Sequence, residues 1–317
     1  MILPSDEELH PIGPEKHWQE SYYFNWADPD GKEFGLTRIG YRFSEKQIDA
    51  LVLTMRDGEP EFMYPGVNLP HKGKWNFKAG AGLRGGRLSY KMIEPLSKWE
   101  LVLSGKNALQ LEWTSLNGAF DYRGEERELP ENVAGYHLEQ MGRVEGWIRV
   151  RGRERQFRGF GERDKSWGVR DWANVEGWNW VSAQFGEGLA FNLWEGFFSR
   201  KRYLNGYVFR DGENAALASA SVRFEWAGRK HLIREALFEM TDVHGKKFRV
   251  RAQPLARVPL VKKGLWLEEV HCRFLLEGGS SATPGIGIIE HAWHAGMLGT
   301  LRQGGDLVRA GAKLLRP

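Results

Sequence analysis

The sequence predicts an all-β protein made of two consecutive antiparallel β-barrels. Short apolar or alternating runs recur about every ten residues, turn residues separate them, and no segment before residue 296 has a strong helical period. The 317 residues are long for one hydrophobic core and sufficient for two domains. We therefore expect one barrel over residues 1–168, and a second barrel with a C-terminal tail over residues 169–317.

The first strands are predicted to form a hairpin. Residues 21–26 and 34–43 are rich in aromatic side chains, and Asp28-Pro29-Asp30-Gly31 between them has the composition of a tight turn. Residues 1–20 contain acidic and proline-containing turns, which indicates an irregular lead-in. Further strands of this half are expected at residues 49–55, 75–77, 88–93, 99–104 and 108–115.

The same pattern continues through the second half of the chain. Strands are expected at residues 136–141, 143–149, 156–160, 178–185, 189–198, 203–209, 218–226, 233–241, 247–252, 265–276 and 286–293. In residues 297–317 leucines recur at roughly helical spacing, but interspersed glycines weaken the segment as a helix. We expect a frayed tail that packs on its own chain, in preference to an anchor on a membrane surface.

Composition excludes several classes of function. The net charge of +4 is spread along the chain, which argues against nucleic acid as a partner. The single cysteine, Cys272, can form no internal disulfide and is expected to be an inert core thiol. Neither a signal peptide nor an apolar run of the roughly 18 residues that a membrane span needs is present, so we expect a cytoplasmic protein. The 14 tryptophans instead suggest an aromatic-lined cavity for a small apolar ligand.

Residues 159–172 hold the densest group of chemically interesting side chains. In an extended strand successive side chains alternate between two faces. One face would carry Glu162, Asp164, Ser166 and Arg170, and the other Arg163, Lys165, Trp167 and Asp171. The acids and bases of this segment could form a buried ion-pair network. Alternatively, one carboxyl group lies beside aromatic walls, where its pKa is raised and it delivers a proton. The best domain boundary, residues 165–176, places this segment at the junction, where ligand sites tend to occur.

Two further groups of residues are candidates for the same site. His137 and Glu139 share one face of a predicted strand, and face either water or a cavity in which they could transfer protons. After the junction, aromatic and polar side chains suit the lining of a cavity, although ordinary alternation between two barrel faces explains them equally. They are Trp178, Asn179, Trp180, Asn192, Trp194 and Glu195.

No motif for a metal or a cofactor is found. His291 and His294 would point to opposite sides of a strand, which disfavours a shared metal. The chain has no P-loop, no GxSxG elbow and no Cys/His cluster, and Gly159-Phe160-Gly161 lacks the third glycine of the dinucleotide fingerprint. We therefore expect neither cofactor nor metal.

The central segment resembles a motif of the hydroxyneurosporene synthases, or carotenoid hydratases, of the lipocalin-like superfamily. Their motif runs glycine, tyrosine, His-Asp-His-Asn-Trp-Gly, and Asp164-Lys165-Ser166-Trp167-Gly168 matches its Asp, Trp and Gly. Arg163 and Lys165 stand where the family has histidines, and Ser166 where it has asparagine. Arg170-Asp171-Trp172, with His137-Leu138-Glu139-Gln140, looks like a bacterial branch of that superfamily.

The resemblance implies two lipocalin-like barrels, a deep apolar cavity and a cofactor-free lyase or isomerase. Such an enzyme would hydrate, cyclise or rearrange a polyene-, terpenoid- or steroid-like substrate, with Asp164 protonating an alkene and His137 and Glu139 assisting. Tryptophan faces could stabilise the carbocation. The expected ligand contacts are Arg163, Trp167, Arg170, Asp171, Trp172, Trp178, Trp180, Asn192 and Trp194.

Two other functions fit the same sequence features. The first is a non-catalytic binding protein for apolar small molecules, in which the charged residues of the central segment only tie the barrels together. The second is a carbohydrate-active protein that stacks sugars on tryptophan, against which the lack of a clear second catalytic carboxylate counts.

Overall fold

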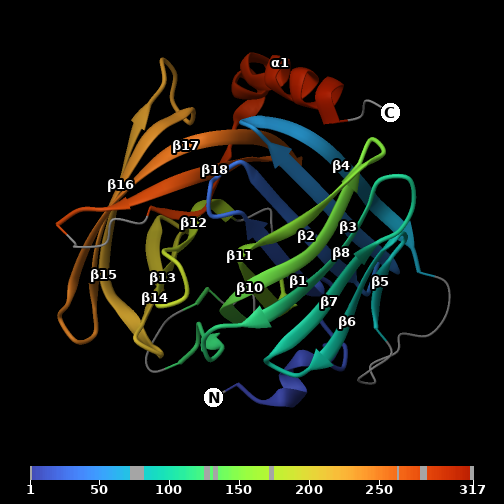
Figure 1. Cartoon of the computed structure of the whole chain (residues 1–317), viewed down its shortest axis with the longest axis horizontal. Helices are drawn as coiled ribbons and strands as arrows, with labels where there is room; N and C mark the ends of the chain where they lie inside the picture. Colours follow the sequence, from blue (N-terminus) through green and yellow to red (C-terminus); the bar gives the residue numbers. More distant parts are fainter. Residues whose placement is uncertain are drawn as a thin grey trace.

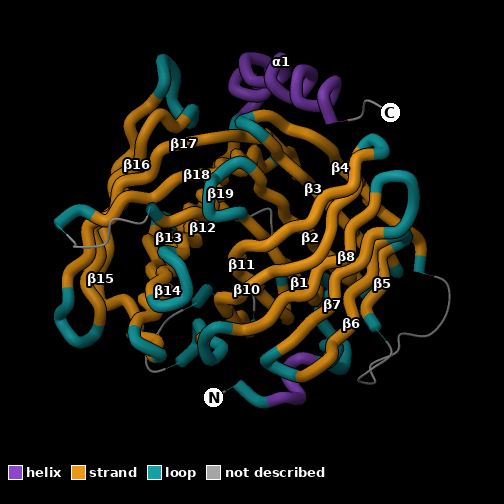
Figure 2. The backbone as a smooth tube through the Cα atoms, viewed as in Figure 1, coloured by secondary structure: helices purple, strands orange, loops and turns teal. Residues whose placement is uncertain are grey.

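The computed structural model describes residues 2–71, 82–124, 129–130, 135–170, 175–262, 264–278 and 284–314, with the backbone alone at residues 262 and 297–303. Within these ranges two antiparallel β-structures lie side by side, and a helix crosses one end of the molecule (Figures 1 and 2). The first is a nearly closed sheet and the second a closed barrel. This confirms the prediction of an all-β protein with two consecutive lipocalin-like barrels.

The first barrel follows the chain in a simple order. Its strands are β1 (Trp18–Ala27), β2 (Glu33–Arg42), β3 (Gln47–Arg56), β4 (Glu59–Pro70), β5 (Leu83–Gly85), β6 (Leu88–Glu94), β7 (Lys98–Leu103), β8 (Ala108–Ser115), β9 (Phe120–Asp121), β10 (Tyr136–Val150) and β11 (Arg153–Val169). They are ordered β4-β3-β2-β1-β11-β10-β8-β7-β6-β5, with β9 paired to β10. The turn predicted at residues 28–31 joins β1 to β2, whereas the strand predicted at residues 75–77 lies outside the described residues.

The second barrel is closed by the pairing of its first and last strands. Its strands are β12 (Val175–Gln184), β13 (Leu189–Phe198), β14 (Lys201–Arg210), β15 (Glu213–Trp226), β16 (Ile233–Asp242), β17 (Lys247–Lys262), β18 (Leu265–Leu276) and β19 (Gly285–His294). Each strand pairs with the next along the chain, and β12 also pairs with β19. Closure pairs each strand on both sides along at least part of its length, which protects strand edges.

Each barrel has its own aromatic core. The interior of the first contains Trp26, Trp99 and Trp113, each at most 1% exposed, and the interior of the second contains Phe238 and Phe274. Because side chains alternate across a strand, the other face of β1, β2, β12 and β13 points toward the neighbouring barrel. A third apolar cluster fills that interface. Burial on both faces explains why β1 and β2 show no alternation of apolar and polar residues.

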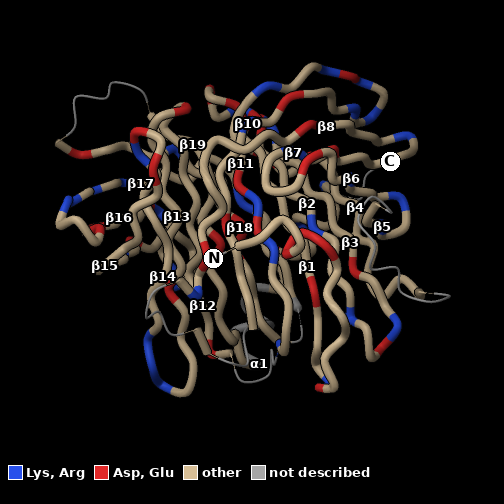
Figure 3. The backbone as a smooth tube through the Cα atoms, turned by 90° about the horizontal axis from the view of Figure 1, so that it is seen from below, with Lys and Arg blue, Asp and Glu red and all other residues tan. Residues whose placement is uncertain are grey.

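The two ends of the chain complete the fold from opposite sides. The short 3₁₀-helix η1 (Pro4–Glu7) packs its buried Glu7 against the first barrel. At the other end α1 (Gly296–Leu314) contacts β4 of the first barrel and β17 of the second (Figure 1). None of the described helices is both long and apolar enough to cross a membrane. Acidic and basic positions are interspersed over both barrels (Figure 3).

The C-terminal segment packs on its own chain as expected, but the expectation that it is frayed is wrong, because residues 296–314 form a continuous helix. Ala310 and Leu314 are 8% and 2% exposed, since they pack against the cluster between the barrels. Tertiary packing of one apolar face stabilises a helix more than intrinsic propensity does, and here it offsets the cost of the glycines.

Candidate functional site

A cavity of about 550 Å³ lies between the two barrels. Its walls come from the outer faces of β1–β4, β10–β13 and β17–β19, and from Leu307, Ala310, Gly311 and Leu314 of α1. Most of the lining is apolar or aromatic, and a small number of charged side chains reach the surface of the cavity. This size and composition suit a small apolar molecule with a few polar groups.

Strand register gathers the polar side chains of the first barrel into one row. Arg38 of β2 pairs with Tyr23 of β1, Tyr23 with Asp164 of β11, and Asp164 with Glu139 of β10. His137 lies two residues before Glu139 and therefore on the same face. The open question about His137 and Glu139 is thus answered, because both side chains turn toward the second barrel and His137 lines the cavity.

The carboxyl group of Asp164 stands on the cavity wall without a fixed partner. Throughout the described part of the chain no residue gives it a hydrogen bond or an ion pair within 4.0 Å. Burial raises the pKa of Asp164 above its ordinary value, although His137 and Arg170 act in the opposite direction. Asp164 is therefore placed to hold a proton and to deliver it into the cavity.

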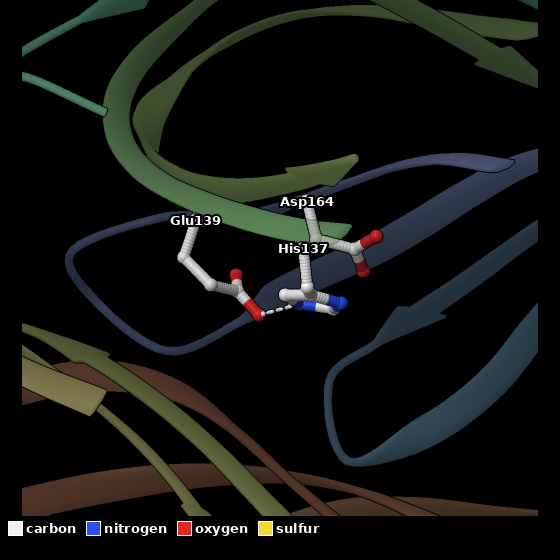
Figure 4. Close-up of side chains that lie close together, drawn as sticks. All are labelled: His137, Glu139 and Asp164. Atoms are coloured by element: carbon white, nitrogen blue, oxygen red, sulfur yellow. Dashed lines mark hydrogen bonds and ion pairs between the residues drawn. The ribbon is translucent and has the colours of Figure 1, made fainter. Parts of the chain in front are cut away.

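His137 lies between the carboxyl groups of Glu139 and Asp164 (Figure 4). Its Nε2 is 2.7 Å from Oε1 of Glu139, and the same oxygen accepts a hydrogen bond of 2.8 Å from Nε1 of Trp180. Burial lowers the pKa of His137 to about 4, so its ring is neutral at pH 7. With Nε2 donating to Glu139, Nδ1 is the ring nitrogen that can accept a proton.

The same three side chains also have the composition of a metal site. One ligand atom each from His137, Glu139 and Asp164 lies within 4.8 Å of the others. However, Nε2 of His137 and Oε1 of Glu139 already bind each other, and Arg170 adds positive charge beside Asp164. The arrangement suits proton transfer better than it suits a cation.

A second buried acid, Glu162, lies behind Glu139. Burial raises the pKa of Glu162 well above its ordinary value, and the negative charge of Glu139 raises it further. Both side chains are fully buried, and Tyr207 donates a hydrogen bond of 3.4 Å to Oε1 of Glu162. Burial and the neighbouring Asp164 likewise raise the pKa of Glu139 well above its ordinary value, while the contact with Glu162 acts in the opposite direction. A proton held on Glu162 therefore favours the charged form of Glu139.

The protonated Glu162 makes a pH-dependent contribution to stability. The unfolded chain loses this proton near the ordinary pKa of 4.5 while the folded chain keeps it, so stability falls as pH rises, by about 1.4 kcal/mol per pH unit up to the folded pKa. We expect Glu162→Gln to gain stability relative to wild type in urea unfolding as pH rises above the ordinary pKa of 4.5 toward the folded pKa. Parallel pH dependences of the two proteins would contradict the assignment.

Several predicted ligand contacts do reach the cavity. Trp178, Trp180, Trp194 and Arg170 line it. Arg170 donates a hydrogen bond to Oγ of Ser166, and burial lowers the pKa of its guanidinium to about 10. Asn192 is buried behind the wall, where its Oδ1 accepts a hydrogen bond from the hydroxyl of Tyr122. The predicted contacts Asp171 and Trp172 lie outside the described residues.

Two predicted ligand contacts point away from the cavity. Arg163 faces the interior of the first barrel, where it donates to Glu7 at 2.7 and 3.1 Å and lies 5.1 Å from the ring centre of Trp113. Trp167 stacks between His10 and Tyr136, with ring centres 4.1 and 4.9 Å apart. The prediction of ligand contacts at Arg163 and Trp167 is corrected, because odd-numbered residues of this segment lie on the face opposite to Asp164.

Lys165 belongs to the same interior network, since its Nζ lies 2.8 Å from Oε1 of Glu20. Of the two sequence interpretations, the buried ion-pair network therefore applies to Arg163 and Lys165. The carboxyl group with a raised pKa is that of Asp164.

The sequence did not single out four charged residues of the cavity, namely Arg38, Asp49, Glu269 and Glu290. Burial and the neighbouring Glu290 raise the pKa of Glu269, and Nε1 of Trp178 donates to Glu290. The available signal was the charge of Arg38 in the middle of a strand whose other charged residues, Glu33 and Arg42, lie at its ends. Glu269 and Glu290 are brought together only by the pairing of β18 with β19.

Several solved structures share this fold. No curated protein matches the sequence. Among solved structures, an AttH-like protein from Nitrosomonas europaea has a TM-score of 0.64 at 14% identity, covering 93% of this chain and 97% of that one. Kievitone hydratase from Nectria haematococca has a TM-score of 0.58 at 12% identity, covering 89% and 93%. CghA with Sch210972 has a TM-score of 0.64 at 15% identity, covering 87% and 88%.

At 12–15% identity these likenesses show the fold alone, and they do not extend to the hydroxyneurosporene synthase family. The model of one sequence family, described as a domain of unknown function, matches residues 3–295, which is nearly the whole chain. The protein therefore belongs to the DUF7064 family.

Proposed function

We propose that the protein is a cofactor-free lyase or isomerase that protonates an alkene of an apolar substrate bound between the barrels. The observation that carries this proposal is the carboxyl group of Asp164. It has a raised pKa and no fixed partner among the described residues, and it faces an apolar, aromatic cavity. Polyene-, terpenoid- and steroid-like molecules are the substrate classes that such a cavity favours.

In the proposed reaction Asp164 transfers its proton to one carbon of the alkene, and the neighbouring carbon becomes cationic. Trp178, Trp180 and Trp194 line the cavity, and their negative ring faces stabilise such a cation. The carboxylate left on Asp164 stabilises it further. The largely apolar walls lower the local dielectric, which strengthens both effects.

His137 completes the reaction as a base. In a hydration, water attacks the cation and gives its proton to Nδ1 of His137; in a cyclisation or rearrangement, a C–H bond next to the cation gives up the proton instead. The carboxylate of Glu139 stabilises the imidazolium that forms, through its contact of 2.7 Å with Nε2. Proton return from His137 to Asp164 restores the starting state. The name of kievitone hydratase, a structural neighbour, supports the hydration variant.

Turnover in D₂O tests the proposal. Unsaturated apolar compounds, including any molecule that co-purifies with the protein, are incubated with it and the products are analysed by mass spectrometry. We expect one deuterium on carbon in each product, with the mass of one added water in a hydration and without it in an isomerisation. Saturable binding without deuterium incorporation or product would overturn the proposal and support a binding protein.

A further inference from the structure

We propose that the substrate carries a carboxylate and that Arg38 binds it, which deepens the proposed function by naming a substrate class. Arg38 lies on β2 and lines the cavity, half-buried. Among the residues that the structure describes, none forms a hydrogen bond or an ion pair with its guanidinium. An Arg fork that faces an apolar cavity without an internal partner is suited to bind a planar anion through two parallel hydrogen bonds.

Gly40 leaves room for this guanidinium. A methyl group at position 40 would lie 2.5 Å from Nη1 and 2.7 Å from Nη2 of Arg38, so the guanidinium lies directly over the glycine. In the strand register Gly40 pairs with Ser21 of β1, and Ser21 pairs with Ser166 of β11. Arg170 donates a hydrogen bond to Ser166. The two arginines therefore approach the cavity from the same side.

The charge of the lining favours one carboxylate over a more highly charged group. Glu269 and Glu290 form an acid pair in which burial and the charge of Glu290 raise the pKa of Glu269 well above its ordinary value. Asp49, a further acid of the lining, is paired with Arg42, so Arg38 and Arg170 are the cations that face the cavity. A single carboxylate can bind to Arg38, whereas a diphosphate would bring several negative charges beside these acids.

The row of side chains also places the reacting bond relative to the acid group. The backbones of Arg38 and Asp164 are separated by β1, which is two strand spacings or about 10 Å, and the guanidinium lies over Gly40, two residues further along β2. Tyr23 stands between them and offers an aromatic surface to the intervening carbon chain. The alkene that Asp164 protonates is therefore several carbons away from the carboxylate.

Equilibrium binding tests this inference independently of turnover. Tryptophan fluorescence is followed while the protein is titrated with two matched pairs of ligands, retinoic acid with retinol and oleic acid with oleyl alcohol. We expect each acid to bind about 10- to 100-fold more tightly than its alcohol, because hydrogen bonds to charged groups are the stronger ones. Arg38→Met is expected to remove this preference and to leave alcohol binding unchanged. The exposed Arg223→Met is the matched control and should keep the preference.

Gly40→Ala is a second variant, which keeps the guanidinium of Arg38 but displaces it. It is expected to weaken binding of the acids while leaving the alcohols unaffected. Equal binding of acid and alcohol by wild type, binding of neither acid, or an unchanged preference in both Arg38→Met and Gly40→Ala would overturn the inference. Deuterium incorporation into neutral substrates alone would refute the carboxylate and keep the proposed reaction. Binding of acids through Arg38 without turnover would support the carboxylate and refute the proposed reaction.

Discussion

Asp164→Asn will abolish turnover while leaving the protein folded and able to bind its ligand. Asparagine keeps the shape of the side chain but cannot donate the proton, and loss of a general acid typically costs about 10²- to 10⁴-fold in rate. Because Asp164 makes no ion pair among the described residues, its replacement leaves no buried cation unpaired. We expect less than about 1 kcal/mol of change in the free energy of unfolding.

The measurement combines product formation, ligand titration by tryptophan fluorescence, and urea unfolding of the same variant. Asp211→Asn, the same change on an exposed turn residue, is the control and should keep full activity. An Asp164→Asn variant that is strongly destabilised would instead support a scaffold role for this carboxylate. Undiminished turnover would contradict its role as the acid.

Glu7→Gln is expected to produce the largest loss of stability. The side chains of Glu7 and Arg163 are both fully buried and make two hydrogen bonds, at 2.7 and 3.1 Å. Removing one charge leaves the other buried without its partner, which costs about 3–5 kcal/mol. Urea unfolding at pH 7 measures the change in the free energy of unfolding.

A double variant separates the value of the pair from the cost of breaking it. Arg163→Met fills the space between Trp99 and Trp113 with an apolar side chain, so adding it to Glu7→Gln should restore much of the lost stability. The exposed pair of Arg234 and Glu225 is the control, and Glu225→Gln should cost less than about 1 kcal/mol. A similarly small effect of Glu7→Gln would show that the pair is unimportant for folding.

The sequence by itself determined the fold class and the two faces of the central segment. Regular spacing of strand-sized runs and turn residues is local information, so the β1–β2 hairpin and the all-β architecture could be predicted. Alternation along an extended strand likewise separated Asp164 from its neighbours Arg163 and Lys165. The aromatic composition also pointed correctly to an aromatic-lined cavity.

Tertiary structure decided what each face meets. Arg163 finds Glu7 at a separation of 156 residues, and Arg38 joins the row of Asp164 only through the pairing of β2, β1 and β11. Alternation says which residues share a face, but it does not say whether that face borders a core or a cavity, because register and barrel packing are long-range properties. The C-terminal helix also depends on long-range packing. Its glycines oppose a helix locally, and the packing of Ala310 and Leu314 between the barrels stabilises it.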